Sequence, residues 1–435
     1  MNVLILGGGG REHALGWKLK QSKQCGKIIF APGNAGTASI GRNMDIAVDH
    51  ITQKVVDEIA SLCRHEKIGL VVIGPEDPLS QGLAGKLRKA GFKVFGPDAD
   101  GARLEGDKAW SKALMRAANV PTAEGRTFEN IEGAMAFVKA HETPVVVKAA
   151  GLAKGKGVVV CDNPAEAQAA VKRMMIDREF GDAGNKLVIE ERLTGQEVSI
   201  LALVDGRDIY VLEPSQDHKQ VGEGDTGPNT GGMGAYTPTP VVDDKAMTAI
   251  ERDVLVPIVD AMRRDEIDYR GVLYAGIMMT PGGIKVLEFN CRFGDPECQP
   301  LMMRMKGDLL AAMLAVCDGE LAEVDIRWDQ RVACCVVICS GGYPGPYTKG
   351  KIITGLDDAA KQPDVMVFHA GTAMNEHGEV VTAGGRVLNV TALGDTLAEA
   401  RDKANAACEM IHFEGAFHRH DIGDRVLRQK HTAKR

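Results

Sequence analysis

The sequence predicts a multidomain protein that combines α/β and α+β architecture, and three observations support this prediction. The chain has 435 residues, which is more than one compact core usually holds and enough for two to four domains. In about the first hundred residues, short apolar strands alternate with helical segments, the pattern of a doubly wound parallel sheet. About the last hundred residues have the pattern of a small α+β domain that ends in a helix near 397–412.

The N-terminal sheet is predicted from apolar runs that each end in turn-forming residues. Strands are expected at 2–6, 27–30, 68–74 and 92–96, and helices at 11–23, 52–64 and 79–90. The strand ends carry GGGG, APGNAG, GPEDP and GPDAD. Because ligands of doubly wound sheets bind at the carboxyl ends of the strands, a ligand site is expected there.

The middle of the chain is predicted from the same periodicities. Helices are expected at 108–118, 164–175 and about 242–264, and strands at 186–191, 197–205, 208–213, 271–279 and 284–289. Two further strands within 143–162 flank a glycine and lysine loop. Residues 214–239 contain hardly any apolar side chains, so they are predicted to form a long loop that is either disordered or functional.

The composition argues against nucleic-acid and membrane partners. The formal net charge of −7 gives no overall attraction for polyanions, and only 5% of the residues are aromatic. The only apolar run at the N-terminus, Val3–Leu6, is too short for a signal peptide core, and no stretch approaches the length of a membrane span. The ten cysteines form no CxxC pair, which fits a reducing compartment. We therefore expect a soluble cytoplasmic protein.

Four consecutive glycines, at 7–10, separate the first predicted strand from the first helix. Without Cβ atoms this turn lets a phosphate approach the helix N-terminus, where the dipole favours an anion. A tight turn that binds nothing explains the same residues. The dinucleotide pattern G-x-G-x-x-G is not met, because Glu12 and His13 stand at its third glycine position, and this argues against a nicotinamide cofactor.

A second glycine-rich stretch, VVVKAAGLAKGKGV, places Lys148 at a strand end, with Gly155, Lys156 and Gly157 in the loop that follows. A donor-rich flap beside a fixed lysine suits closure over nucleotide phosphates. The spacing does not fit the pattern G-x-x-x-x-G-K-[ST]. A solvated hairpin with surface lysines is the alternative.

The stretch EFNCRFGDPE, at 288–297, combines acidic, amide and arginine side chains. Because side chains alternate along a strand, Glu288 and Asn290 should share a face. A carboxylate and an amide oxygen are hard ligands of the kind that Mg²⁺ prefers. Arg292, on the same face if the strand continues, could brace a carboxylate or phosphate. A surface ion pair between Glu288 and Arg292 is the alternative.

The histidines are not predicted to bind metal. His13, His218 and the pair His418 and His420 lack metal-ligand spacing with any cysteine or carboxylate cluster, so structural or solvent roles are expected. The sequence also contains no G-x-S-x-G elbow and no cysteine nucleophile motif.

Taken in order, these stretches resemble the ATP-grasp superfamily, with Lys108 as the entry lysine, an E-E-x-L hinge at 190–193 and E-x-N at 288–290. GGGGREHAL, GPEDPLSQG, KAAGLAKGKGV, DHKQVGEGDTGPNTGGMGAY and RFGDPECQ are similar to motifs of the phosphoribosylamine-glycine ligase family, over essentially the whole chain. Two positions depart from that pattern: Ala150 stands where aspartate is usual, and His418 where tyrosine is usual.

The resemblance implies three domains: a phosphoribosyl-binding domain at 1–103, an ATP-grasp domain at 104–327 with a small flap lobe at about 122–193, and a C-terminal α+β domain at 328–435. It implies a ligase of purine biosynthesis that uses ATP and Mg²⁺ or Mn²⁺ to join glycine to 5-phosphoribosylamine through glycyl phosphate. The implied protein is a monomer that transiently contacts the upstream amidotransferase.

The resemblance also assigns site residues. The residues implied for ATP are Lys108, Lys148, Gly155, Lys156, Gly157, Glu190, Glu191, Leu193 and Glu197, and those for the metal ion are Glu288 and Asn290. The residues implied for the phosphoribosyl substrate are Gly8, Gly9, Gly10, Arg11, Pro75, Glu76 and Asp77. Arg292, which would contact the glycine carboxylate or the acyl phosphate, is assigned to catalysis together with Lys148 and Asp295.

Three other functions fit parts of the sequence. A nicotinamide-dependent oxidoreductase would use the N-terminal sheet, and a nucleotide sensor would bind ATP without turnover. Within the superfamily, a biotin-dependent carboxylase would take bicarbonate as the acceptor. The substrate dependence of phosphate release distinguishes the ligase from each of them.

Overall fold

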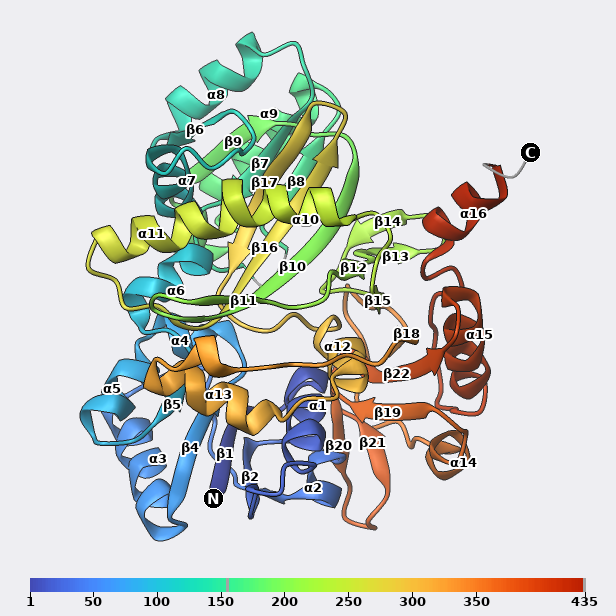
Figure 1. The fold of residues 1–435 in the computed structure, drawn as a ribbon. Coiled ribbons are helices and arrows are strands. Elements are labelled where there is room, and N and C mark those ends of the chain that lie inside the picture. The colour runs from blue at the N-terminus through green and yellow to red at the C-terminus, as the bar shows by residue number, and fades with distance from the viewer. Residues whose placement is uncertain (154–155, 433–435) are drawn as a thin grey trace.

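The computed structural model of the protein describes residues 1–153 and 156–432 (Figure 1). Gly155 of the predicted flap lies outside these residues. Within them, no helix combines the length and the apolar character that crossing a bilayer requires. All ten cysteines fall in the described ranges, and all are free thiols.

The N-terminal region is a five-stranded parallel sheet, as predicted, with the strand order β3-β2-β1-β4-β5. Its strands are β1 (Asn2–Gly7), β2 (Ile28–Pro32), β3 (Arg42–Asn43), β4 (Ile68–Ile73) and β5 (Val94–Phe95). Its helices are α1 (Gly10–Leu19), α2 (Thr37–Ile40), α3 (Gln53–His65), α4 (Glu76–Ser80), α5 (Leu83–Lys89) and α6 (Ala99–Gly106). The strand order reverses between β1 and β4, so the segments that follow these two strands meet at the switch point where such sheets bind ligands.

Two helix predictions in this region are wrong in detail. The helix predicted at 79–90 is two helices, α4 and α5, because Gly82 between them has a left-handed φ of +73° that an α-helix cannot include. The helix predicted at 11–23 ends at Leu19.

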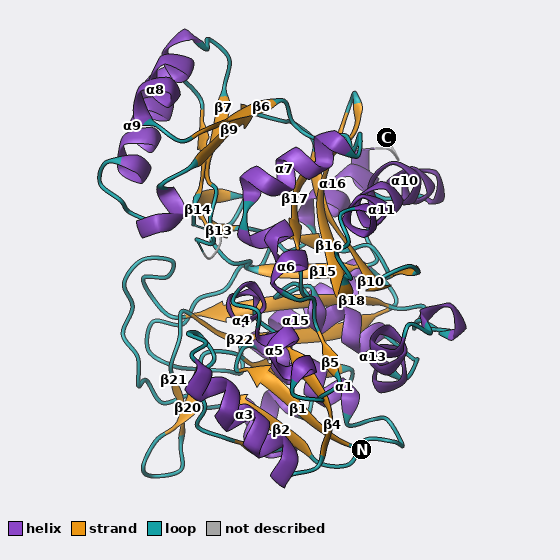
Figure 2. Ribbon diagram, turned by 90° about the vertical axis from the view of Figure 1, so that its left-hand side faces the viewer, coloured by secondary structure: helices purple, strands orange, loops and turns teal. Residues whose placement is uncertain are grey.

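The small lobe is a four-stranded sheet in the order β6-β9-β7-β8, with two helices on one side (Figure 2). Its strands are β6 (Gly125–Phe128), β7 (Val145–Ala149), β8 (Val158–Cys161) and β9 (Leu187–Glu191). The covering helices are α8 (Ile131–Ala140) and α9 (Pro164–Met175), followed by the 3₁₀ turn η1 (Gly181–Gly184). The hairpin of β7 and β8 confirms the two predicted strands.

The large lobe is a second antiparallel sheet, in the order β11-β10-β16-β17. Its strands are β10 (Gln196–Asp205), β11 (Ile209–Val211), β16 (Arg270–Thr280) and β17 (Gly283–Asn290). The helices of this part are α7 (Lys108–Ala117), α10 (Asp244–Ile250), α11 (Val256–Arg264), α12 (Cys298–Arg304) and α13 (Leu309–Asp318). The long helix predicted at about 242–264 runs through α10, the π-helical turn η2 (Glu251–Leu255) and α11, which cross β16 and β10 in Figure 1.

Residues 214–239 contain four short strands, so the expectation of one long loop and its disordered alternative are wrong, whereas the functional alternative is not contradicted. They form β12 (Gln216–Asp217), β13 (Gln220–Gly222), β14 (Thr226–Asn229) and β15 (Gly234–Thr237). β13 and β14 make a hairpin, while β15 pairs with β18 of the C-terminal region. Backbone hydrogen bonds to distant strands stabilise this stretch although it has few apolar side chains.

The C-terminal region is a five-stranded sheet in the order β12-β15-β18-β22-β19, packed on α15. Its further elements are η3 (Leu321–Glu323), β18 (Val332–Cys339), α14 (Leu356–Ala360), β19 (Val365–His369), β20 (Thr372–Met374), β21 (Val380–Thr382), β22 (Arg386–Gly394), α15 (Leu397–Cys408) and α16 (Asp424–Thr432). Because β12 and β15 lie before residue 328 in the chain, this sheet joins residues from both sides of that predicted boundary. The domain boundaries themselves stay a proposal.

Candidate active site

A cavity of about 1040 Å³ opens where the N-terminal sheet, both lobes of the middle region and the C-terminal sheet meet. The predicted site residues that line it are Arg11, Pro75, Glu76, Asp77, Lys108, Lys148, Gly157, Glu190, Glu191, Leu193, Glu197, Glu288, Asn290, Arg292 and Asp295. Among the described residues, the predicted ones outside its lining are Gly8, Gly9, Gly10 and Lys156. The fold thus brings together predicted residues that are up to 284 positions apart, Arg11 and Asp295.

The glycine turn between β1 and α1 is packed tightly against other parts of the chain. The Gly9 N–H donates to the Glu12 carboxylate at 2.6 Å, so an acidic side chain of the helix itself satisfies this end of α1. A Cβ at Gly10 would lie 2.0 Å from the Asn389 amide nitrogen. Close packing therefore accounts for glycine here, and the phosphate site on this turn stays a prediction.

Lys156, the one described flap lysine, reaches toward the C-terminal region. Its ammonium group donates to the Pro344 carbonyl at 3.3 Å. Gly157 follows it and lines the cavity. The flap therefore contacts the C-terminal region on one side and the cavity on the other.

Arg292 lies between two carboxylates of the N-terminal region. Its guanidinium group donates to Glu105 at 2.7 Å and to Glu76 at 3.3 Å. β17 ends at Asn290, so Arg292 does not continue the strand, and its partners replace the alternative pair with Glu288. The fork of Arg292 is held from two sides, which fixes its position at the cavity wall.

The surroundings of Arg292 shift the pKa values of its two partners in opposite directions. Burial raises the pKa of Glu76, but the charges of Arg292 and Arg11 outweigh burial and lower it to about 2. Burial raises the pKa of Glu105 above its ordinary value, although Arg292 opposes this shift. Glu76 is therefore the partner that is firmly ionised near neutral pH.

Lys148 shares the Glu190 carboxylate with a second lysine. Lys112, on α7, contacts this carboxylate at 2.6 Å, and Lys148 contacts its other oxygen. Lys148 also donates to the Leu287 carbonyl at 3.1 Å, at a bulge of β17 that directly precedes Glu288. This buried triad ties α7, the small lobe and the strand end of the large lobe together.

Lys219 connects two predicted site carboxylates. Its ammonium group pairs with Glu197 and lies 4.0 Å from Glu288. Burial lowers the pKa of Lys219, but the carboxylates of Glu197, Glu288 and Asp217 outweigh it and raise the pKa above its ordinary value. Lys219 therefore carries its positive charge into the cavity beside Glu288.

Glu288 and Asn290 form a donor pair that fits a hard divalent cation. Both line the cavity, and the Glu288 side chain is 31% exposed. Burial raises the pKa of Glu288, but Lys219, Lys108 and Lys148 lower it below its ordinary value, so the group is a carboxylate. A carboxylate and an amide oxygen at the end of one strand match the ligand preference of Mg²⁺ and Mn²⁺.

Asp295 is bound by an arginine of the C-terminal sheet. Arg386, at the start of β22, lies 3.7 Å from the Asp295 carboxylate and donates to the Asp295 carbonyl at 2.5 Å. The same guanidinium group donates to the Gly231 carbonyl at 2.7 Å. Burial raises the pKa of Asp295, but Arg386 and Arg11 outweigh it and lower the pKa.

The residues of the cavity or of its immediate supports that sequence reasoning missed include Glu105, Lys112, Lys219 and Arg386. Lys219 lies in the long glycine-rich segment at 214–239, which stood out in the sequence but did not identify this lysine as a site residue. The others look like ordinary helix or strand charges, because their partners are far away in the chain.

Models of three domains of one family match the chain in order. The N domain of phosphoribosylglycinamide synthetase matches residues 1–105, its ATP-grasp (A) domain matches 106–298, and its C domain matches 333–425. The chain belongs to the phosphoribosylglycinamide synthetase family. This confirms the resemblance found in the sequence.

Relatives of high similarity cover almost the whole chain. A phosphoribosylamine–glycine ligase of Rhodopirellula baltica is 51% identical over 98% of this chain and 98% of the relative. One of Salmonella typhimurium is 48% identical over 99% of this chain and 100% of the relative. The similarity to these relatives thus extends over nearly the full length of this chain.

Solved structures confirm the predicted fold. The phosphoribosylamine–glycine ligase of Thermotoga maritima superposes with a TM-score of 0.83 at 34% identity, covering 97% of this chain and 100% of that one. A biotin carboxylase domain from Hydrogenobacter thermophilus has a TM-score of 0.72 at 16% identity, over 96% of this chain and 91% of that one. At that identity the second likeness shows the shared fold alone.

Proposed function

We propose that the chain is an ATP-dependent carbon–nitrogen ligase of purine biosynthesis that joins glycine to 5-phosphoribosylamine. The products would be glycinamide ribonucleotide, ADP and phosphate. The observation that carries the proposal is one cavity that holds an acid and amide pair, several fixed cations and Arg292. The family and the names of the full-length relatives support the same activity.

In the first proposed step, a glycine carboxylate oxygen attacks the γ-phosphorus of ATP, the bond to the β-phosphate oxygen breaks, and ADP leaves. Lys108, on α7, and Lys148, on β7, neutralise phosphate charge at the cavity wall. Glu288 and Asn290 would hold Mg²⁺ or Mn²⁺, which supplies further charge neutralisation when it is bound. Arg292, held by Glu76 and Glu105, orients the carboxylate or the acyl phosphate.

In the second proposed step, the amine of 5-phosphoribosylamine attacks the carbonyl carbon of glycyl phosphate. The C–N bond forms, phosphate leaves, and the nitrogen loses a proton. We assign the phosphoribosyl group to the switch-point wall of the cavity, at Arg11, Pro75, Glu76 and Asp77. Positioning and charge neutralisation account for this chemistry without a covalent nucleophile on the protein.

The assignment of ATP to the hinge between the lobes is also part of the proposal. Glu191 and Leu193 line the cavity where β9 leads into β10, and Glu197 follows at the start of β10. Glu190 has its carboxylate engaged by Lys112 and Lys148, so we assign it to positioning of the lysines. A cytoplasmic location, a monomeric state and a transient contact with an upstream amidotransferase belong to the same proposal.

The test is phosphate release from ATP with the substrates omitted one at a time. The ligase requires both glycine and 5-phosphoribosylamine, whereas an ATP-binding sensor releases no phosphate and a biotin-dependent carboxylase responds to bicarbonate. A nicotinamide-dependent oxidoreductase would change the nicotinamide absorbance instead. If phosphate release continues at the same rate when glycine or 5-phosphoribosylamine is omitted, the proposal is contradicted.

The metal assignment is tested by Glu288→Gln, which keeps the shape of the side chain but removes its charge. We expect turnover to fall by roughly 10² or more, because the positioning of the metal and phosphates is lost. Near wild-type turnover in the folded variant would refute the metal assignment. It would not contradict the proposed ligase activity, which is tested separately by phosphate release.

A further inference from the structure

Three side chains with metal-binding atoms meet at the end of α15, away from the cavity described above. Glu409 follows α15, and His418 and His420 flank Arg419 in the segment before α16. One ligand atom of each lies within 4.8 Å of the others. The sequence did not reveal this group, because Glu409 is nine residues before His418 and no regular spacing links them.

The distances between these atoms suit a tetrahedral metal site. The Glu409 Oε1 atom lies 3.4 Å from the His418 Nε2 atom and 3.3 Å from the His420 Nε2 atom. A Zn²⁺ ion binds such atoms at about 2.0–2.2 Å, which places two tetrahedral ligands roughly 3.4 Å apart. Both contacts therefore have the length expected between two ligands of one ion, and they are long for hydrogen bonds.

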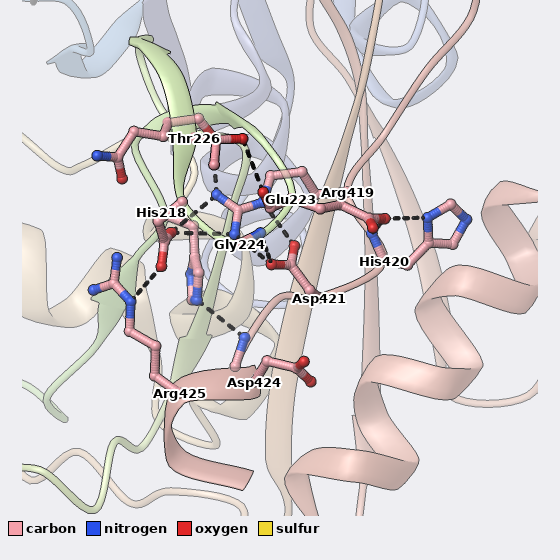
Figure 3. Close-up of polar contacts among 12 residues, drawn as sticks. His218, Glu223, Gly224, Thr226, Arg419, His420, Asp421, Asp424 and Arg425 are labelled. Atoms are coloured by element: carbon pink, nitrogen blue, oxygen red, sulfur yellow. Dashed lines mark hydrogen bonds and ion pairs between the residues drawn. The ribbon is translucent and has the colours of Figure 1, made fainter. Parts of the chain in front are cut away.

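The other ring nitrogen of His420 is held by a carboxylate from a distant segment. The His420 Nδ1 atom lies 2.8 Å from Glu223 Oε1, and Figure 3 shows this contact between the segment before α16 and the turn between β13 and β14. A carboxylate on the remaining nitrogen is the usual outer partner of a metal-binding histidine, because it fixes the orientation of the ring.

His418 lacks a satisfactory partner in the absence of an ion. Its side chain is 11% exposed, and its Nε2 atom is buried without a well-directed hydrogen bond. His420 and Glu409 are 57% and 65% exposed, so an ion can reach the group from solvent. A second cavity of about 400 Å³, also lined by His412, adjoins the three side chains and leaves room for a water ligand.

We propose that Glu409, His418 and His420 bind a divalent transition-metal ion, with Zn²⁺ as the ion that this ligand set favours. The two imidazoles are borderline ligands that select Zn²⁺ over Mg²⁺ or Ca²⁺, the carboxylate is a third ligand, and water completes the fourth position. His418 and His420 were expected to have structural or solvent roles, and the proposal revises that expectation.

The proposed ion would strengthen a tie between two regions of the protein. In Figure 3, Arg419 and Asp421 from the C-terminal segment already contact Asp225 and Gly224 of the turn that also carries Glu223. That turn belongs to the hairpin of β13 and β14, whose residues Gln220 and Asn229 line the active-site cavity. Binding of the ion would thus stabilise the position of the β13 and β14 hairpin at the cavity wall, although none of the metal ligands lies in the cavity itself.

The alternative is a hydrogen-bonded group with a protonated His420 between two carboxylates. Hydrogen bonds that His420 donates to the carboxylates of Glu223 and Glu409 raise its pKa and outweigh the effect of partial burial, which is consistent with this state. Binding of a metal would displace that proton. The proposal predicts that the protein binds Zn²⁺ in a stoichiometric amount, whereas the hydrogen-bonded alternative predicts that it does not.

The test is calorimetric titration of the chelator-treated full-length protein with Zn²⁺, in excess Mg²⁺ to occupy oxygen-ligand sites. We expect one tight site per chain. His418→Phe keeps the ring but removes its nitrogens, and it should weaken binding by roughly 100-fold, while Glu223→Gln should weaken it roughly tenfold. His377→Phe, which changes an exposed histidine in the turn between β20 and β21, is the matched control and should bind like wild type.

Equal Zn²⁺ binding by wild type and His418→Phe, or no binding by wild type, overturns the proposal. If His418→Phe does not fold, titration of wild type with Co²⁺ decides, because histidine-bound tetrahedral Co²⁺ absorbs strongly in the visible range. The absence of that band, or a band that Glu409→Gln retains in full, also overturns it. None of these measurements depends on the ligase activity.

Discussion

At the scale of single residues, the cavity is organised by charged side chains that bind one another in fixed pairs. Arg292 lies between Glu76 and Glu105, and Lys148 shares Glu190 with Lys112. Buried charges are stable only when they are paired, so each of these groups depends on a partner from another element. The pairs therefore fix the positions of the cations before any substrate binds.

The pairing of Glu76 with Arg292 predicts a specific pH dependence of stability. The pKa of Glu76 is about 2, below its value of about 4.3 in an unfolded chain. The ionised group thus stabilises the fold above about pH 4.3, and this contribution, at most about 3 kcal/mol, is lost as the pH falls toward 2. In Glu76→Gln the fall of the urea midpoint between pH 7 and pH 3 should be smaller than in wild type.

Glu132→Gln, which changes an exposed carboxylate on α8, is the control and should keep the wild-type fall. Each protein is compared with itself at the two pH values, so loss of the pair at neutral pH does not obscure the result. The same fall in Glu76→Gln as in wild type would contradict the assignment of this shift to Glu76.

Sequence reasoning identified site residues only where several informative residues are adjacent in the chain. Lys148, Glu288 and Asn290 stand in short patterns that predict phosphate or metal binding, and all three line the cavity. Glu105 and Arg386 have no such neighbours, because their partners lie 187 and 91 residues away. Contacts at that separation depend on how the sheets pack, which a local pattern does not encode.

At the scale of elements, α7 is the helix that carries lysines to the cavity. Lys108 opens this helix and lines the cavity, and Lys112 follows one turn later. The Asp107 side chain caps the helix by accepting the Trp110 N–H at 3.0 Å. The cap thus fixes the start of the helix at the residue where Lys108 must point inward.

Asp107→Ala should therefore lower stability by about 1 kcal/mol and raise the KM for ATP more than that for glycine. The first effect follows from the lost cap, and the second from fraying of the turn that bears Lys108. Asp107→Asn keeps the capping oxygen and is the matched control for both measurements, which are urea unfolding and steady-state kinetics. A change in the glycine KM alone would argue against this role.

The short strand β15 shows how an element can be stabilised by distant pairing. Its glycine, Gly234, lies opposite Val336 of β18, and a Cβ there would meet the Cys335 carbonyl oxygen at 2.6 Å and Ile422 at 2.7 Å. A side chain at this position would push the two strands apart. The apolar pattern of residues 214–239 gave no sign of this strand, because the pairing is made through the backbone.

Gly234→Val should consequently lower the thermal midpoint by several degrees and reduce activity, because β15 anchors the segment that carries Lys219. Overpacking of this kind costs about 1–3 kcal/mol. Gly282→Ala is the control, since a Cβ there meets only Thr280, at 3.7 Å, in the turn between β16 and β17. Equal thermal midpoints for the two variants would show that β15 does not depend on this close approach.

At the scale of the whole molecule, the cavity exists only because three regions of the chain meet. The parallel sheet and the α+β character of the C-terminal region could be predicted from the periodicity of apolar residues, because this periodicity shows which face of a single helix or strand is buried. The participation of β12 and β15 in the C-terminal sheet could not, because it depends on pairing between regions that are distant in sequence. A substitution at such a junction should affect fold and function together.

Arg386 is the residue at which this can be measured. From the C-terminal sheet it donates to the carbonyls of Gly231 and Asp295, and its guanidinium group lies 3.7 Å from the Asp295 carboxylate. Arg386→Met leaves these oxygens without their donor, and we expect a loss of about 3 kcal/mol in stability and at least about tenfold in kcat/KM. Arg386→Lys keeps the charge but not the planar fork, so its losses should be intermediate.

The control for Arg386 is Lys361→Met, which removes an exposed pair with Asp358 near the end of α14 and should leave the free energy of unfolding nearly unchanged. Denaturation at several urea concentrations and steady-state kinetics on the same preparations measure both effects. Because Arg386 touches two segments that line the cavity, its loss should also weaken the stabilisation that ATP gives against unfolding. A variant that loses stability but keeps the full ATP-induced stabilisation would show that the C-terminal region supports the fold without shaping the site.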